Sequence, residues 1–253
     1  MAVREITAAV VRSWLASLKD EGMSSKSVNR KTSSLRSFYK YLIRMGEVEQ
    51  SPMAAIFALK SPTRLPVFVE QENMAELFGE VRFPDDWEGL TDRLLLALLY
   101  NTGMRLSELI QLREGQVDEG NRVIKVLGKG NKERVIPVSP ALLGMVRDYR
   151  EKKRVLVEGA DAEVLLVGRK GRRLYPKYVY RAVQAYLGQV TTISKRSPHV
   201  LRHTFATHLM NEGAELNSVK ELLGHASLAA TQVYTHNTIE KLKDIYKKAH
   251  PKA

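Results

Sequence analysis

The sequence contains no cysteine. Without thiols the chain can form no disulfide, offer no thiolate nucleophile and hold no zinc through cysteine. Long apolar runs are also missing, since the longest purely apolar stretch, Leu94–Tyr100, is about a third of a bilayer span. The first residues show no apolar signal region with a cleavage site, so we expect no export and a cytoplasmic protein.

The charge of the chain is strongly one-sided. Forty Lys and Arg residues stand against 28 Asp and Glu, which gives a net charge of +12. Hydrophobic residues make up 44% and charged residues 27%, which is typical of a globular protein. An excess of positive charge this large favours a polyanionic partner, most simply nucleic acid. The alternative is a globular fold that is merely basic.

One segment, from Ser24 to Arg44, contains six basic residues and no acidic residue. Apolar residues recur there at helical spacing and Gly46 follows as a stop, so the pattern predicts one helix. Arg36, Lys40 and Arg44 are four residues apart, so they would form one ridge of this helix. Repulsion between these like charges would be relieved by a DNA backbone, whereas a solvated helix face usually includes acids. The predicted DNA contacts in this segment are Lys26, Arg30, Lys31, Arg36, Lys40 and Arg44.

A domain boundary is predicted by the stretch from Lys60 to Pro66, which has two prolines and little periodicity. Ahead of it, apolar spacing from Ile6 to Leu18 indicates another helix. We therefore predict a small helical domain over residues 1–60, a linker over 61–69, a larger domain over 70–236 and a tail over 237–253.

The larger domain alternates between helical and strand-like patterns. Arg122–Leu127 and Arg134–Val138 read as a hairpin, and Val164–Val167 as a third strand. The predicted class is mainly α with a small antiparallel β-sheet (α+β). The predicted helices are Glu70–Val81, Trp87–Tyr100, Arg105–Leu112, Pro140–Arg154, Pro176–Leu187, Ser197–Asn211, Leu216–Leu223, Ser227–Tyr234 and Thr238–Ala249.

The most suggestive chemistry lies at the start of one of these helices. His199 and Arg202 are three residues apart, within the first turns of a helix that Ser197 would cap, where an anion such as phosphate is favoured. Zinc bound by His199 and His203 is one rival, but Val200 stands where the zinc-protease pattern needs Glu. A buried structural His–Arg pair is the other.

Four further residues are weak signals when taken singly. Arg105 begins a helix after a glycine, and it could instead be a surface arginine that pairs with Glu108. Lys129 lies between two glycines at the hairpin tip, either as a ligand contact or in an ordinary basic turn. The residue after it is not Ser or Thr, so this is no Walker P-loop. His225 ends one predicted helix, and Tyr234 lies on the next.

Taken in order, Arg105, Lys129, His199-x-x-Arg202, His225 and Tyr234 form a recognisable set. With these residues the chain resembles the tyrosine site-specific recombinases of the integrase family, and within them the Xer type. The resemblance covers nearly the whole chain, although family members generally have about one more helix ahead of Ile6. The matching stretches are Thr102–Leu109, Gly128–Arg134, His199–His208, Leu223–Ser227, Thr231–His236 and Tyr246–Pro251.

The resemblance implies a two-domain DNA clamp with the tyrosine recombinase catalytic fold. Tyr234 would be the nucleophile that forms a 3′-phosphotyrosine, and Arg105 and Arg202 would stabilise charge on the phosphate. Lys129 would protonate the leaving oxygen, and His199 and His225 would donate hydrogen bonds, with His199 helping to deprotonate Tyr234. Lys132 would be a further DNA contact. Strands would be exchanged through a Holliday junction without a metal, ATP or another cofactor.

The implied partners are double-stranded DNA with specific recombination sites, other recombinase protomers in a homo- or hetero-tetramer, and an accessory regulatory protein. The resemblance implies no membrane partner and a location at the nucleoid. The helix Thr238–Ala249 would link neighbouring protomers, or its apolar stripe could fold back on its own domain.

Two other functions stay open. A type IB topoisomerase would use similar residues but act alone, and a non-catalytic DNA-binding regulator would not need Tyr234.

Overall fold

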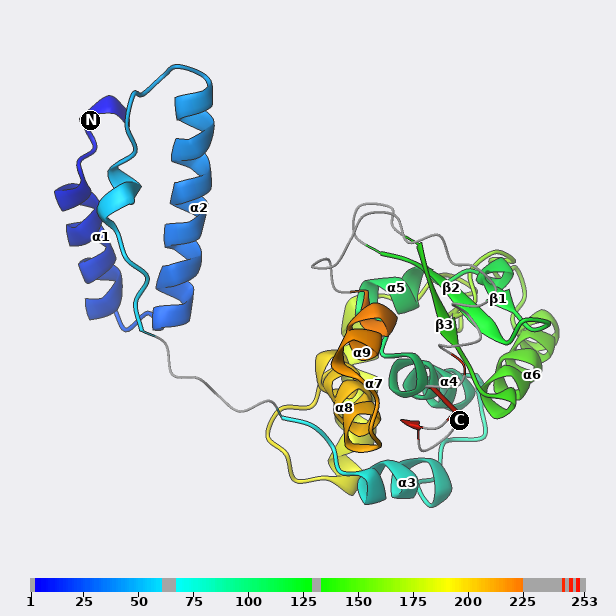
Figure 1. Cartoon of the computed structure of the whole chain (residues 1–253). Coiled ribbons are helices and arrows are strands. Elements are labelled where there is room, and N and C mark those ends of the chain that lie inside the picture. The colour runs from blue at the N-terminus through cyan, green and yellow to red at the C-terminus, as the bar shows by residue number, and fades with distance from the viewer. Residues whose placement is uncertain are drawn as a thin grey trace. The chain divides into compact units, whose positions relative to one another are not determined.

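The computed structural model describes residues 3–60, 67–128 and 133–224, together with residues 243, 246, 247, 249 and 250. It divides into two compact units, Met1–Leu65 and Pro66–Ala253 (Figure 1). The predicted class is confirmed, since the described elements are mainly helices with one three-stranded antiparallel sheet.

The first unit consists of two helices and a returning segment. Thr7 and Ser24 cap the helices by accepting hydrogen bonds from the backbone N–H groups of Val10 and Ser27. Apolar residues of both helices pack with Met53 and Ile56 of the returning segment into one core. The elements are η1 (Val3–Glu5), α1 (Ala8–Asp20), α2 (Ser25–Arg44) and η2 (Pro52–Ala55).

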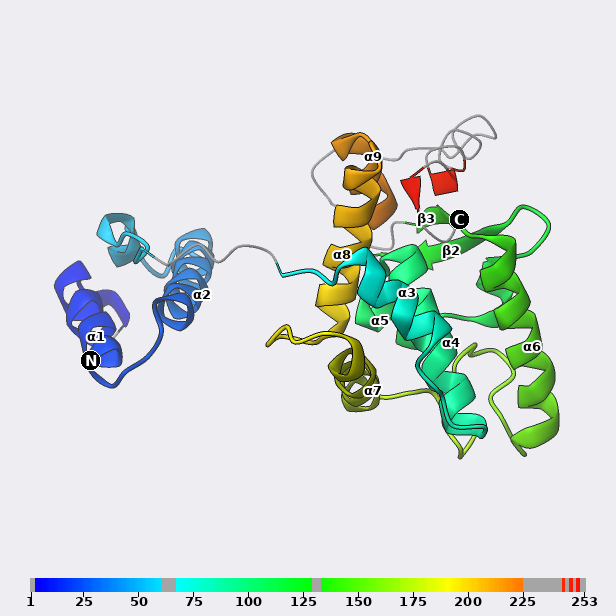
Figure 2. The same ribbon diagram turned by 90° about the horizontal axis from the view of Figure 1, so that it is seen from below.

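The second unit is built around α4 (Trp87–Thr102), which contacts α5, α6, α7 and α8 (Figure 2). This position explains the longest apolar run in the chain, because all of Leu94–Tyr100 is buried. No helix in the described ranges is both long and apolar enough to span a membrane. The other helices are α3 (Gln71–Gly79), α5 (Leu106–Gln111), η3 (Glu114–Gln116), α6 (Pro140–Leu156), α7 (Pro176–Val190), α8 (Pro198–Asn211) and α9 (Leu216–Leu223).

The small sheet has the strand order β1-β2-β3, and both pairs are antiparallel. Its strands are β1 (Val117–Asp118), β2 (Val123–Leu127) and β3 (Glu133–Pro137). The predicted hairpin is confirmed, because β2 pairs with β3 in a register that sets Leu127 opposite Glu133. Residues 128–132 connect these two strands.

The prediction of a third strand at Val164–Val167 is wrong, because β1 is the third strand of the sheet. The four residues are buried but have separate partners. Val164 forms an isolated bridge with Arg113, and the Val167 carbonyl accepts hydrogen bonds from the Trp87 and Tyr149 side chains. An apolar run of this length predicts that the residues are buried, but it does not specify that they pair with a neighbouring strand.

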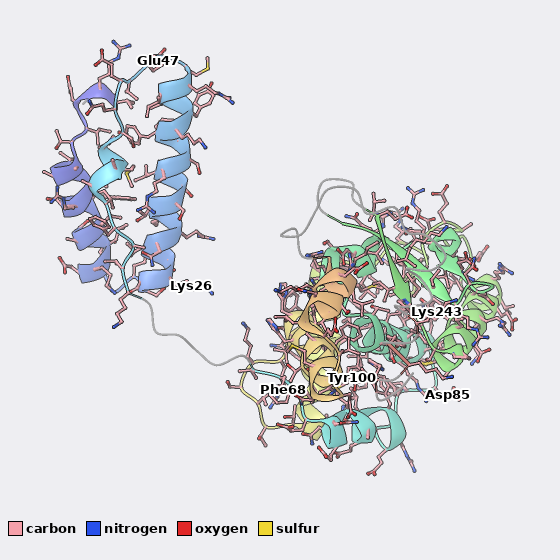
Figure 3. All side chains as sticks on the ribbon, in the orientation of Figure 1. Lys26, Glu47, Phe68, Asp85, Tyr100 and Lys243 are labelled. Atoms are coloured by element: carbon pink, nitrogen blue, oxygen red, sulfur yellow. The ribbon has the colours of Figure 1, made fainter. Side chains whose placement is uncertain are left out.

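The last residue of the predicted linker has partners in the second unit. Val69 is fully buried in the second unit, and its N–H donates to Thr204 Oγ1 at 3.0 Å. The Val69 carbonyl lies 3.0 Å from Nε2 of His208, whose Nδ1 is 3.0 Å from the Tyr100 hydroxyl. Phe68 and Tyr100, which flank His208 by edge-on ring contacts, are labelled in Figure 3. The chain is therefore anchored in this unit from Val69 onward.

The described tail residues dock on their own unit. Tyr246 and Ala249 are buried in a second core with Phe205 of α8 and apolar residues of α9. The Tyr246 ring stacks on that of His250, with 4.9 Å between ring centroids. The predicted helix Ser227–Tyr234 and most of Thr238–Ala249 lie outside the described residues. Of the predicted apolar stripe, Tyr246 is the member that the structure describes, and it packs on its own unit.

Candidate active site

The site is framed by a glycine at the end of α4. Gly103 has a left-handed φ of 57°, and a Cβ there would lie 2.4 Å from the Phe205 ring and 2.9 Å from Leu223. Only glycine allows α4 to end this close to α8 and α9. The chain then turns into α5, and Arg105 at its N-cap position faces the C-terminal end of α9.

Arg105 is tied to its own helix and to α9. Its Nη1 donates to Glu108 Oε1 at 2.7 Å, and its backbone N–H donates to Glu108 Oε2 at 2.7 Å. Its Nη2 donates to the Gly224 carbonyl at 3.0 Å, and 34% of the side chain is exposed. The pair with Glu108 that the surface alternative required is thus present, but the same guanidinium also reaches a distant segment.

Arg202 approaches the same segment from α8, and it is only 8% exposed. Its Nη1 donates to the Gly103 carbonyl at 2.6 Å, and its Nη2 donates to the Leu223 carbonyl at 2.7 Å. A guanidinium has five N–H donors, so these two bonds fix its plane and use only part of its capacity. The structure therefore brings Arg105 and Arg202 to neighbouring carbonyls, those of Gly224 and Leu223.

A third arginine, Arg134 of β3, completes the cluster from a fully buried position. Its Nη1 and Nη2 donate to the two carboxylate oxygens of Glu108 at 2.9 and 2.8 Å. Its Nε donates to the Leu222 carbonyl at 2.8 Å. The last carbonyls of a helix lack partners within it and carry partial negative charge. Here the carbonyls of Leu222, Leu223 and Gly224 each accept from a different arginine.

The cluster carries three positive charges against the single negative charge of Glu108. Burial raises the pKa of Glu108, but the hydrogen bonds and charge of Arg134, with those of Arg105, lower it to about 2. Burial and the neighbouring charges of Arg105 and Arg134 lower the pKa of Arg202 to about 10. The remaining positive charge makes this end of α9 suited to an anion such as phosphate.

His199 and His203 lie on the exposed side of α8, one turn apart. Burial and the charges of His199, Arg202 and Lys195 lower the pKa of His203. Ser197 occupies the N-cap position, but its hydroxyl makes no capping hydrogen bond. The buried His–Arg pair is not formed, because Arg202 bonds to main-chain carbonyls while His199 is exposed.

Four predicted site residues, Lys129, Lys132, His225 and Tyr234, lie outside the described residues. Their chain neighbours are placed, however. Lys129 and Lys132 fall within the connection between β2 and β3, and β3 carries Arg134. His225 directly follows Gly224, whose carbonyl accepts from Arg105.

Sequence reasoning missed the roles of Glu108 and Arg134. Strand alternation contained the signal for Arg134, since it shares a face of the hairpin with Val126 and Ile136, both buried. A charged residue on a buried face requires a buried partner of opposite charge. For Glu108, the signal was its position three residues after Arg105 at a helix start.

The other predicted contact surface is α2 in the first unit. Val28, Thr32 and Tyr39 face the core of that unit. At 3.6 residues per turn, the exposed residues Lys26, Arg30, Lys40 and Arg44 lie on the side turned away from it. Figure 3 shows the side chain of Lys26 extending from the start of the helix. This side of α2 presents positive charge without an acidic residue.

Arg36 and Lys31 of α2 have partners on other segments of the first unit. Arg36 Nη2 donates to the carbonyl of Ile56, which ties the helix to the returning segment. Lys31 is half-buried, with Nζ 6.0 Å from the centroid of the Trp14 ring. The expected ridge of Arg36, Lys40 and Arg44 therefore loses its first member to a structural contact.

Comparison with known proteins matches both units to domains of phage integrases. Residues 68–241 match the phage integrase family, and residues 1–46 match the phage integrase N-terminal SAM-like domain. Tyrosine recombinase XerC of Chlorobaculum tepidum is 38% identical, over 98% of this chain and 80% of the relative. XerC of Listeria monocytogenes is 39% identical, over 99% of this chain and 84% of the relative.

Solved structures support the same assignment at the level of the fold. The XerH site-specific recombinase in a post-cleavage complex with difH DNA aligns with a TM-score of 0.74 and 22% identity, over 97% of this chain and 70% of that one. XerA recombinase aligns with a TM-score of 0.55 and 25% identity, over 100% and 87% of the two chains. On its sequence, its fold and its paired arginines, the chain belongs to the phage integrase family, as a tyrosine recombinase of the Xer type.

Proposed function

We propose that this protein cleaves and rejoins double-stranded DNA at specific sites and exchanges strands between two duplexes. The observation that carries the proposal is the convergence of Arg105 and Arg202 on the end of α9, directly ahead of His225 in the chain. Two guanidiniums held by main-chain carbonyls offer planar donors to the oxygens of one phosphate.

The proposed cleavage is a transfer between two oxygens. The Tyr234 hydroxyl attacks phosphorus, the bond from phosphorus to the 5′ oxygen breaks, and the DNA is left as a 3′-phosphotyrosine ester. The Tyr234 proton passes to a base, for which His199 is the candidate, and Lys129 donates a proton to the departing 5′ oxygen. A 5′-hydroxyl from the partner duplex then reverses the step, through a Holliday junction, without net consumption of a cofactor.

Stabilisation of charge is assigned to the arginines. In the transition state the non-bridging oxygens carry the developing negative charge, and fixed donors at that point lower the barrier most. Arg202 is held at both Nη atoms, so it would need little rearrangement when the substrate binds. Arg105 is more exposed and is held through Glu108 and Gly224.

Strand exchange between two duplexes requires four active sites, so we propose a tetramer of protomers on DNA. The tail would connect the protomers. In a single chain Tyr246 and Ala249 bury themselves against α8 and α9, and the same apolar surface would receive the tail of a neighbour. Duplex DNA as the partner would place the protein with the nucleoid.

The direct test is covalent capture. The protein is incubated with nicked duplexes that carry candidate recombination sites, and we expect an adduct that resists denaturation. Tyr234→Phe removes only the phenolic oxygen, so it should bind the same duplex and form no adduct. Adduct formation by Tyr234→Phe would show that another nucleophile carries the reaction.

A further inference from the structure

Glu108 is a buried carboxylate within the proposed phosphate-binding site. A site that binds phosphate should repel a carboxylate, yet Glu108 is only 7% exposed and lies among the three arginines. Both of its oxygens are fully engaged. Oε1 accepts from Arg105 and Arg134, and Oε2 accepts from Arg134 and from the backbone of Arg105.

The two arginines that share Glu108 differ in exposure. The Arg134 side chain is 5% exposed and makes a two-bond pair with the carboxylate, while the Arg105 side chain is 34% exposed. A bidentate, desolvated pair is the stronger of the two interactions. The negative charge of Glu108 is therefore compensated mainly from the buried side, by a residue turned away from solvent.

We infer that Arg134 is a positioning residue of this site that keeps the charge of Arg105 available for the phosphate. With Arg134 in place, Glu108 can orient Arg105 without neutralising it. Without Arg134, the carboxylate would pair with Arg105 alone, and the cluster would face the DNA with one positive charge fewer. The inference rests on the proposed function, since it assigns a role within the same reaction.

The packing around Arg134 fits this role. A Cβ on Gly224 would lie 3.0 Å from Arg134 Cδ and 3.3 Å from its Nε, so the chain that leads into His225 is shaped around this side chain. Arg134 also holds the Leu222 carbonyl, next to the Leu223 carbonyl held by Arg202. It thus fixes the end of α9 at the point where Arg105 and Arg202 reach it.

The test compares two DNA linkages under single-turnover conditions with excess protein. The substrate is the nicked duplex that gives the wild-type adduct, with either a phosphodiester or a methylphosphonate at the cleaved position. A methylphosphonate is neutral, so it depends less on positive charge. We expect Arg134→Met to slow cleavage of the phosphodiester by about 10- to 100-fold. Its methylphosphonate-to-phosphodiester rate ratio should rise by about the same factor, because the loss is in charge stabilisation.

A defect in folding alone would lower both rates together and leave the ratio at the wild-type value, which would overturn the inference. The matched control is Arg150→Met, which removes a half-buried arginine elsewhere in the second unit, paired with Glu114 and Glu119. Its ratio should equal that of the wild type. Arg134→Gln, which keeps a polar partner for Glu108, serves if Arg134→Met does not fold.

A second substitution separates charge from shape. Adding Glu108→Gln to Arg134→Met removes the uncompensated carboxylate, so phosphodiester cleavage should recover several-fold over Arg134→Met and the ratio should return toward wild type. A further loss would contradict charge compensation. Failure of the wild type to form any adduct would instead refute the proposed function, so the two failures are distinguishable.

Discussion

At the scale of the residue, the site depends on where each guanidinium places its donors. Arg202 gives one donor to Gly103 and one to Leu223, and both acceptors are main-chain carbonyls that cannot rotate away. The fork is thus oriented before any substrate arrives. Lysine has no planar fork, so Arg202→Lys would keep the charge and lose this orientation.

The acid role proposed for Lys129 can be separated from phosphate binding by changing the leaving group. A 5′ thiolate is much less basic than a 5′ alkoxide and needs no proton as the bond breaks. Lys129→Ala should therefore cleave ordinary DNA slowly and recover most of its rate when sulfur replaces the bridging 5′ oxygen. The measurement is the rate of adduct formation on the two substrates.

Arg202→Ala is the control for that experiment, because its proposed partners are the non-bridging oxygens, which this replacement leaves in place. It should lose about 100-fold or more in cleavage and show no comparable recovery with the thiol leaving group. Recovery of both variants, or of neither, would leave Lys129 without a distinct acid role.

Glu108 predicts an acid-dependent loss of stability. Its pKa is lowered to about 2 from an ordinary value of 4.5, so the unfolded state binds its proton first as the pH falls. The stabilisation is fully present above about pH 4.5 and is lost as the pH approaches 2, with a total of about 3 kcal/mol.

Urea unfolding of the wild type and Glu108→Gln at pH 7 and pH 3 measures this contribution. The free energy of unfolding of Glu108→Gln should depend less on pH across that interval, because the group that titrates has been removed. Equal pH dependence in the two proteins would mean that Glu108 is not the group responsible.

At the scale of the element, α2 and α6 offer a matched test of DNA contact. Each phosphate that is neutralised contributes about 0.9 to the slope of log affinity against log salt. Replacing Lys40 and Arg44 together with Ala should flatten that slope by about two units. Arg36 is left unchanged, because it holds the Ile56 carbonyl.

The control replaces Lys152 and Arg154 with Ala, an exposed pair of the same residue types on α6. This change removes the same charge from another element and should leave the slope nearly unchanged. An equal effect of both double variants would mean that general charge, rather than the α2 surface, governs DNA affinity.

Periodicity predicted most elements because it reports which face is buried. The basic helix and the hairpin are found as expected. The helix predicted over Trp87–Tyr100 runs on to Thr102, where Gly103 ends it, and the Asn101 and Thr102 side chains donate to the carbonyls of Ala97 and Leu98. Such local bonds, like the separate partners of Val164–Val167, depend on neighbours that a pattern of apolar residues does not specify.

At the scale of the molecule, the order of motifs identified the family, whereas the links between distant segments came only from the structure. The ion pair of Glu108 with Arg134 spans 26 positions, and the bond from Arg105 to Gly224 spans 119. Spacing along one helix can suggest a pair such as Arg105 with Glu108. It cannot show that a strand residue will share the same carboxylate.

The meeting of three arginines at the end of α9 also bears on whether a partly unfolded molecule could damage the DNA of the cell. Parts of a fold can open locally at a lower cost in free energy than unfolding of the whole domain. If the end of α9 opened in this way, Arg105, Arg134 and Arg202 would each lose one carbonyl partner in a single event. Under the proposed mechanism such a molecule would lose the ordered arginines that cleavage requires, and would therefore leave DNA uncut rather than cut without rejoining.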